Sequence, residues 1–407
     1  MSYPDLDVGL SEEDIAARDM VRRFGNEVMR PIGIRLDKLA DPQQVIAKDS
    51  ELWDVHRTYR ELGLHTRRLA GAGGAGLSPL GGIQINEELG YADSGLAISI
   101  AVAGAPFAYA AASREPELQG WAKAYAEDTK AELIGCWAIT EPDHGSDWIL
   151  AGEPTSSNPL MAPQLKAVKK GKEYVLTGQK SAWVSNGTIA THASLHVSLD
   201  SDQGMHGTAI CIVPLDLPGI SRGKPLDKHG QRALNQGEIF FEEVVIPEKY
   251  MVVPDSARVN VMLGYNTWTG ANTGMSVTFA GCAKSALDEA ITYAKQRVQG
   301  GVAIIEHQNI KLKLMQMLQM VEAARSLSRR TMLYNMANPP GSLSHAVSAK
   351  ALSTETAFKV ASEAVQIHGG NGLSKEYVIE KIMRDARASM IEDGTNEALL
   401  LRGAAFL

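Results

Sequence analysis

The chain has 407 residues, which is enough for about two or three domains of ordinary size. Its residues are 44% hydrophobic and 21% charged with a net charge of −7, a balance that excludes an intrinsically disordered chain and argues against nucleic acid as the main partner. The three cysteines, Cys136, Cys211 and Cys282, are widely spaced and predict neither a disulfide framework nor a metal site.

The N-terminal segment is acidic, with Asp5, Asp7 and Glu12 among its first residues. It lacks the apolar run of a signal peptide and the arginine-rich composition of a transit peptide. We also expect no membrane association, on the ground that no window approaches the roughly 18 apolar residues of a spanning helix. These features predict a cytoplasmic protein.

The first third of the chain is predicted to be mainly helical. Ser11 is expected to cap a helix, with Asp14 placed for the first turn, and apolar residues follow at helical spacing. A later apolar segment, residues 96–111, is rich in small residues that allow close packing. The segment is either core or the wall of a binding pocket, and on the second interpretation Leu96 and Ile100 face the ligand.

The pattern changes near residue 133. Short alternating runs, such as residues 192–198, are separated by Gly, Pro and Asp turns and predict a small β-domain that ends near residue 253. Beyond it, apolar stripes at helical spacing over residues 310–324 and 357–365 predict long helices.

The stretch of residues 364–400 combines two features that suit chemistry. A glycine-rich turn around Gly369 can bring backbone N–H groups close to a phosphate, because glycine has no Cβ and tolerates positive φ. Glu392 and Asp393 stand just before Gly394, and a carboxylate that loses hydration in a cleft becomes a stronger base. Each pattern alone also fits an ordinary loop or a solvated helix end.

This stretch resembles the C-terminal signature of the acyl-CoA dehydrogenase family, which runs Q-I-x-G-G-x-G, E-Y, R-D-x-R and I-x-E-G-T. The matching residues are Gln366, Gly369, Gly370, Gly372, Glu376, Tyr377, Arg384, Asp385, Arg387, Ile391, Gly394 and Thr395. The catalytic glutamate of the family falls on Asp393. The resemblance therefore implies that Asp393 is the catalytic base.

Three further motifs resemble the same family. They are TEPDHGSD at residues 140–147, KSAWVSNG at residues 180–187, and Arg297 with Gly301, His307 and Gln308. The family implies FAD, for which Trp183 would supply an apolar wall and Thr140 and Ser185 hydroxyl donors, while Arg297 would reach the pyrophosphate.

The resemblance also defines the full set of candidate residues. The candidate cofactor-binding residues are Thr140, Ser146, Trp183, Ser185, Arg297, Gln308, Gln366, Gly369, Gly370, Thr395 and Glu397. The candidate substrate-binding residues are Ser146, Leu96, Ile100, Asn272 and Gly394.

The implied fold is α+β and mainly helical, with an N-terminal helical domain at residues 1–132, a middle β-domain at 133–253 and a C-terminal four-helix bundle at 254–407. The implied reaction is the α,β-dehydrogenation of an acyl-CoA thioester, in which a base takes the α-proton and the β-hydrogen leaves as hydride to flavin N5. An electron-transfer flavoprotein would accept the electrons. We expect a homotetramer, with a heterotetramer as the alternative, in which the glycine turn meets the FAD of a neighbouring subunit.

Several departures from the family pattern bear on function. Asp393 is one methylene shorter than glutamate, Glu392 replaces a tyrosine and is expected to face elsewhere, and Ala271 removes the base that some members carry on another helix. Because residues 96–101 contain no cation, we expect an uncharged acyl group, with branched or alicyclic chains as options. The alternatives are a flavin oxidase or monooxygenase similar to nitroalkane oxidase, and a non-catalytic subunit of a mixed oligomer.

Overall fold

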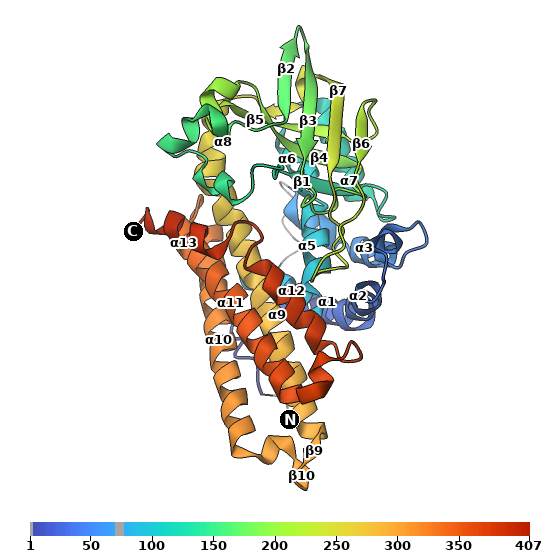
Figure 1. Ribbon diagram of the computed structural model, residues 1–407, viewed down its shortest axis with the longest axis vertical. Helices are drawn as coiled ribbons and strands as arrows, with labels where there is room; N and C mark the ends of the chain where they lie inside the picture. The colour runs from blue at the N-terminus through green and yellow to red at the C-terminus, as the bar shows by residue number, and fades with distance from the viewer. Residues whose placement is uncertain (1–2, 70–76) are drawn as a thin grey trace.

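The computed structural model describes residues 3–69 and 77–407, and it has a β-sheet at one end and a bundle of long helices at the other (Figure 1). Ser11 caps the first helix as predicted, because its Oγ accepts from the N–H of Asp14 at 3.1 Å. The helices of the N-terminal part are α1 (Glu12–Phe24), α2 (Arg30–Asp37), α3 (Leu52–Glu61), α4 (Pro79–Ala92), α5 (Ser94–Val102), α6 (Ala105–Ala112) and α7 (Pro116–Glu127).

The middle of the chain forms a mostly antiparallel sheet. Its strands are β1 (Gly135–Ala138), β2 (Lys166–Lys170), β3 (Glu173–Lys180), β4 (His192–Ser198), β5 (Thr208–Pro214), β6 (Ile220–Arg222), β7 (Ile239–Pro247) and β8 (Met251–Val253). They are ordered β6-β7-β3-β2-β4-β5-β8, and β1 pairs in parallel with β4. β4 and β5 are buried along nearly their whole length, which explains their continuous apolar character.

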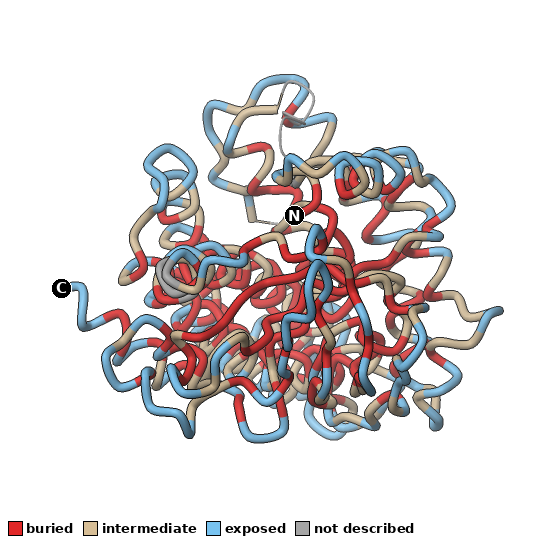
Figure 2. The backbone as a smooth tube through the Cα atoms, turned by 90° about the horizontal axis from the view of Figure 1, so that it is seen from above, coloured by how far each residue is buried: buried red, intermediate tan, exposed pale blue. Residues whose placement is uncertain are grey.

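The C-terminal part returns to helices. Its elements are α8 (Ser256–Val261), α9 (Trp268–Gln296), a hairpin of β9 (Val298–Gln299) and β10 (Val302–Ala303), α10 (Gln308–Ala337), α11 (Leu343–His368), α12 (Ile379–Ser389) and α13 (Asn396–Ala404). Side chains of α9, α10, α11 and α12 share one apolar core. Seen from above, buried backbone runs through the interior and exposed segments form the rim (Figure 2). The predicted mainly helical α+β class, with a sheet in the middle and a C-terminal bundle, is confirmed.

One expectation about apolar segments is wrong. The 19-residue stretch Ser94–Ala112 contains an 18-residue window with a mean hydropathy of 1.6, which satisfies the length and composition of a membrane span. The stretch covers both α5 and α6, and 56% of that window is buried inside the protein. The helical core of a folded protein satisfies the same criteria.

A buried charge cluster joins the three parts of the chain. Lys381 of α12 donates from Nζ to Asp93 at 2.7 Å and to Asp385 at 2.5 Å. Asp93 caps α5 by accepting from the N–H of Leu96 at 2.9 Å. Asp385 also accepts from the backbone N–H of Gln231, which belongs to the segment between β6 and β7. All three charged groups are at least 94% buried, so one cation holds two desolvated carboxylates.

Replacing Lys381 by Met should therefore reduce the free energy of unfolding by about 3–5 kcal/mol, because it leaves two buried carboxylates without their cation. Lys359→Met is the control, since Lys359 forms a partly exposed pair with Glu355 and should contribute less than about 1 kcal/mol. Urea unfolding of both variants measures the difference. Equal losses in the two variants would contradict a structural role for the cluster.

Candidate active site

A cavity of about 430 Å³ opens between the sheet, α5, α9 and the segment between α12 and α13, and we call it the central cavity. It brings together candidate residues that lie up to about 250 positions apart in the sequence. Those that line it are Thr140, Ser146, Trp183, Ser185, Asp393 and Gly394.

The wall on the sheet side is suited to a flat apolar ring. Trp183 leaves 58% of its surface exposed although its neighbour Val184 is buried, so the indole faces the cavity without protein cover. The Oγ of Ser146 accepts from the N–H of Thr395 at 3.1 Å. This contact ties the TEP-containing segment to the turn that carries Asp393.

Asp393 lies in a tight turn between α12 and α13. Its φ of 49° is in the left-handed region, which the short polar side chain of aspartate tolerates better than most residues. Gly394 follows with a φ of 96°, and a Cβ there would lie 2.5 Å from Cδ1 of Ile149. In the part of the chain that the structure describes, the Asp393 carboxylate accepts no hydrogen bond. The turn presents that carboxylate to the cavity as an uncommitted acceptor.

Lys350 of α11 supports this turn from the protein interior. Its buried Nζ donates to the carbonyl oxygen of Gly394 and to Oδ1 of Asn396, both at 2.9 Å. Burial lowers the pKa of Lys350 to about 8. Burial raises the pKa of Asp393, and the charge of Lys350 partly opposes that rise. Asp393 is therefore a stronger base than an ordinary aspartate.

Glu392 also lines the central cavity, which corrects the expectation that it faces elsewhere. Its Oε2 accepts from Nε2 of Gln231 at 2.9 Å. Burial raises the pKa of Glu392 to about 7, while the Gln231 hydrogen bond and Lys228 oppose the rise. The cavity thus contains two adjacent carboxyl groups, of which Glu392 is hydrogen-bonded and Asp393 is not.

The expectation for the α5 wall is wrong. Leu96 and Ile100 are only 0% and 5% exposed and belong to the core of the N-terminal helices, and the residue of α5 that lines the cavity is Ile98. Residues two positions apart on a helix point about 200° apart, so Ile98 faces the opposite side. The expected absence of a cation from the pocket wall is also wrong, because Lys228 and Arg387 line the central cavity.

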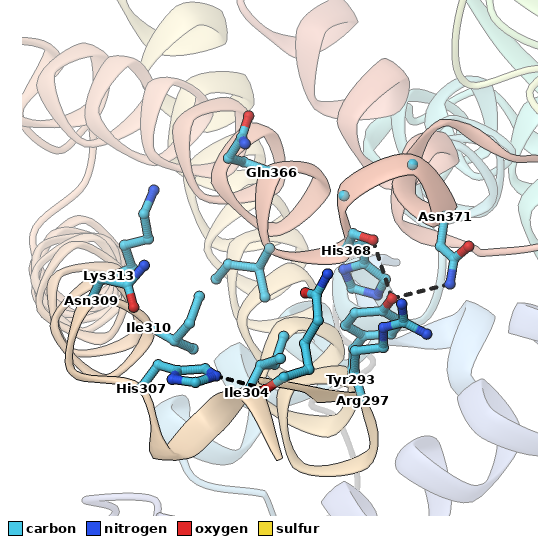
Figure 3. A pocket seen from close by; sticks show the side chains of 14 residues that line it. Tyr293, Arg297, Ile304, His307, Asn309, Ile310, Lys313, Gln366, His368 and Asn371 are labelled. Atoms are coloured by element: carbon cyan, nitrogen blue, oxygen red, sulfur yellow. Dashed lines mark hydrogen bonds between the residues drawn. The ribbon is translucent and has the colours of Figure 1, made fainter. Parts of the chain in front are cut away.

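A second cavity of about 700 Å³ lies beside the turn that follows α11, near the β9–β10 hairpin, and we call it the bundle-end cavity (Figure 3). It brings together Arg297, Gln366, Gly369 and Gly370. A Cβ at either glycine would meet no atom within 4 Å, so the backbone there is open to a ligand. No described carboxylate forms an ion pair with the exposed Arg297 guanidinium. This combination of open backbone and free guanidinium suits a phosphate.

The remaining candidates do not line either cavity. Gln308 is exposed at the start of α10, although the residues on both sides of it line the bundle-end cavity. Asn272 is buried in α9, where its Nδ2 donates to the carbonyl of Trp268 at 2.9 Å and its Oδ1 has no partner among the described residues. Thr395 and Glu397 bond to each other at 2.6 Å at the start of α13.

Sequence reasoning missed Lys228, Gln236 and Lys350. Lys228 and Gln236 come from the segment between β6 and β7, and no motif marks them. Lys350 lies within a long helix whose pattern indicates only a buried face. One local signal could have identified Lys350, namely a lysine at a helix position where apolar residues are expected. A lysine that is buried requires polar partners, so such a position indicates a buried polar contact.

Comparison with known proteins covers nearly the whole chain. The sequence matches the acyl-CoA dehydrogenase N-terminal domain over residues 11–115, the middle domain over 136–244 and the C-terminal domain over 271–407. It is 30% identical to the short-chain specific acyl-CoA dehydrogenase of Megasphaera elsdenii over 346 residues, which are 84% of this chain and 85% of that protein.

Solved structures give the same result. Butyryl-CoA dehydrogenase from Megasphaera elsdenii has a TM-score of 0.84 at 27% identity, covering 98% of this chain and 99% of that chain. A chain from the structure described as the electron transferring flavoprotein of Acidaminococcus fermentans has a TM-score of 0.83 at 26% identity, covering 99% and 100%. With all three domains matched and a carboxylate in the cavity between them, the chain belongs to the acyl-CoA dehydrogenase family of FAD-dependent oxidoreductases.

Proposed function

We propose that this chain oxidises an acyl-CoA thioester at its α,β-bond with Asp393 as the base. The observation that carries the proposal is the free carboxylate of Asp393 in the central cavity, with a pKa raised by burial. Such a carboxylate takes a proton more readily than an exposed one. Glu392 is less suited to that step, because Gln231 already occupies one of its oxygens.

The cavity residues also fit FAD. Trp183 would cover one face of the isoalloxazine ring, and the hydroxyls of Thr140 and Ser185 would donate to its polar edge. When bound, FAD supplies a hydride acceptor for the β-hydrogen of the substrate. Asp393 holds the α-proton after its transfer, and Lys350 keeps the turn in place through Gly394. The apolar cover of Trp137 and Ile98 excludes water.

We place the diphosphate of FAD in the bundle-end cavity, contributed by a neighbouring subunit's copy of the cofactor. The support is the open glycine backbone at Gly369 and the guanidinium of Arg297, unpaired among the described residues, which line the bundle-end cavity and not the central cavity. This arrangement requires at least a dimer, and we propose a tetramer by resemblance to the family. The proposed electron acceptor is an electron-transfer flavoprotein, as the likeness to the Acidaminococcus fermentans chain suggests.

We further propose a short, uncharged acyl group. The related Megasphaera elsdenii proteins are described as short-chain specific and as a butyryl-CoA dehydrogenase. Ile98, Trp268 and Met275 bound a cavity of about 430 Å³, which leaves little room for a long chain beside a flavin ring. Of the two cations that line the cavity, Lys228 already donates to Leu234 and Gln236, whereas Arg387 forms no ion pair with a described residue. The proposal of an uncharged acyl group therefore rests on the relatives and the apolar lining, and not on an absence of cations.

Asp393→Asn should leave FAD bound and slow anaerobic flavin reduction by butyryl-CoA by about 10²–10⁴-fold, the usual contribution of a positioned base. Glu392→Gln is the matched control at the adjacent carboxyl group and should have a much smaller effect. Asp393→Glu should also be slow, because the longer side chain displaces the carboxylate from the position that aspartate gives it. Rapid mixing measures all three rates.

The same assay tests the alternatives. A near-normal rate in Asp393→Asn would reject Asp393 as the base. Faster reduction by glutaryl-CoA than by butyryl-CoA would reject the uncharged acyl group. Rapid oxygen consumption with a small nitroalkane, without flavin reduction by any acyl-CoA, would favour an oxidase.

Lys350→Met should shift the pH dependence of flavin reduction to higher pH. The charge of Lys350 lowers the pKa of Asp393, so its removal raises that pKa and fewer molecules carry an ionised base at a given pH. The acidic limb of the rate profile reports this change. Lys359→Met, on the exposed side of the same helix, should leave the limb in place. An unshifted limb in Lys350→Met would show that its charge does not act on the base.

Arg297→Ala should weaken FAD binding by about tenfold or more, because it removes a charge-assisted hydrogen bond to a phosphate. Arg23→Ala, at an exposed position of α1, is the control. Titration of apoprotein with FAD measures both affinities. Equal FAD affinity of the Arg297→Ala variant and the wild type would place the diphosphate elsewhere.

A further inference from the structure

The side chain of Gln236 is held between the sheet and the central cavity. The main chain of Gln236 pairs with Ser185 in an antiparallel bridge. The main-chain carbonyl oxygen of Gln236 accepts from the N–H of Leu226 at 2.9 Å. The residue is only 6% exposed. Its carboxamide therefore has a fixed position, and the open question is which end carries the oxygen.

Two neighbours determine the orientation of the carboxamide, because one of them can only donate a hydrogen bond and the other can only accept one. Nζ of Lys228 can only donate when charged, and it lies 2.7 Å from Oε1 of Gln236. The carbonyl oxygen of Trp183 can only accept, and it lies 3.2 Å from Nε2 of Gln236. A flipped carboxamide would place two donors together at one end and two acceptors together at the other. The orientation is thus dictated by chemistry at both ends.

The third neighbour is the Ser185 hydroxyl, which can donate or accept. Nε2 of Gln236 lies 3.1 Å from its oxygen, so Ser185 accepts that bond and its own hydrogen must point elsewhere. No described residue accepts this hydrogen, and Ser185 lines the central cavity. We propose that Lys228 and Gln236 are positioning residues that orient the Ser185 hydroxyl as a hydrogen-bond donor into the central cavity.

The contacts of Lys228 make it a stable anchor. Its Nζ also donates to the carbonyl oxygen of Leu234 at 2.8 Å. Burial lowers the pKa of Lys228 to about 8, and the carboxylates of Glu392 and Asp385 oppose that fall, so the ammonium form is the main one at neutral pH. The inference rests on the proposed function in one respect, because the acceptor that the hydroxyl meets is the bound flavin. A donor aimed at the ring stabilises the negative charge that develops there on reduction.

Gln236→Glu gives the sharpest test. The carboxylate keeps the size of the side chain and a partner for Lys228, but it can only accept, so Ser185 must donate to it and no longer to the cavity. We expect the flavin reduction potential to fall, with the equilibrium ratio of reduced to oxidised flavin down about tenfold, and the visible spectrum to change. Ser185→Ala should lower the potential as well, and in that background Gln236→Glu should lower it by less than in the wild type, because only the field of its negative charge remains.

Lys228→Met should shift the potential in the same direction, because it frees the carboxamide to rotate and removes a cation, and the part of the shift that depends on the hydroxyl should disappear in the Ser185→Ala background. Lys224→Met is the matched control, since Lys224 is exposed in the same segment between β6 and β7, and it should change neither potential nor spectrum. If Gln236→Glu does not fold, Lys228→Met decides in the same assay.

The outcomes separate this inference from the proposed function. An unchanged potential and spectrum in Gln236→Glu or Lys228→Met, with a shift in Ser185→Ala, would overturn the role of the two positioning residues while flavin reduction by butyryl-CoA still stands. Additive shifts in the double variant would overturn it as well. A wild-type protein that binds no FAD would overturn the proposed function, and the assigned acceptor with it.

Discussion

The position of the active-site walls depends on the buried Lys381. One ammonium group joins Asp93 at the start of α5 to Asp385 of α12, and Asp385 in turn holds the backbone of Gln231. Since Gln231 also donates to Glu392, the cluster continues into the central cavity. A shift of any of these elements would leave a charge buried without its partner, so they move together or not at all.

This coupling explains how three parts of the chain build one cavity. The turn after β3 supplies the Trp183 wall, α5 supplies Ile98, and the segment after α12 supplies Asp393. Apolar packing between these parts allows small displacements of one part relative to another, because apolar contacts are not directional and form again in the new position. Hydrogen bonds to buried carboxylates are directional, so they fix the relative placement that a reaction between atoms in contact requires.

Sequence reasoning succeeded where local motifs carry the information. The glycines near Gly369, the TEP segment and Trp183 are defined by backbone shape and short spacing, and they lie in the two cavities as a group. It failed for α5, because a helix that is apolar on all sides does not show which face is turned to a ligand. It also failed for Lys228, because no motif marks the segment that holds Lys228 and Gln236, and only the folded structure brings that segment against Trp183 and the central cavity.

The backbone of its turn suits aspartate at position 393, the proposed base. Aspartate tolerates a φ of 49° better than most residues, because its short polar side chain can hydrogen-bond locally, so the chain shape at position 393 is compatible with this acid. Burial then raises the pKa of that acid while Lys350 limits the rise and holds Gly394. The position of the turn that carries this carboxylate is held by the 2.9 Å bond from Lys350 to Gly394 and by the bond from the Thr395 N–H to Ser146. The backbone conformation of this turn and the pKa of the Asp393 carboxylate therefore both depend on Lys350.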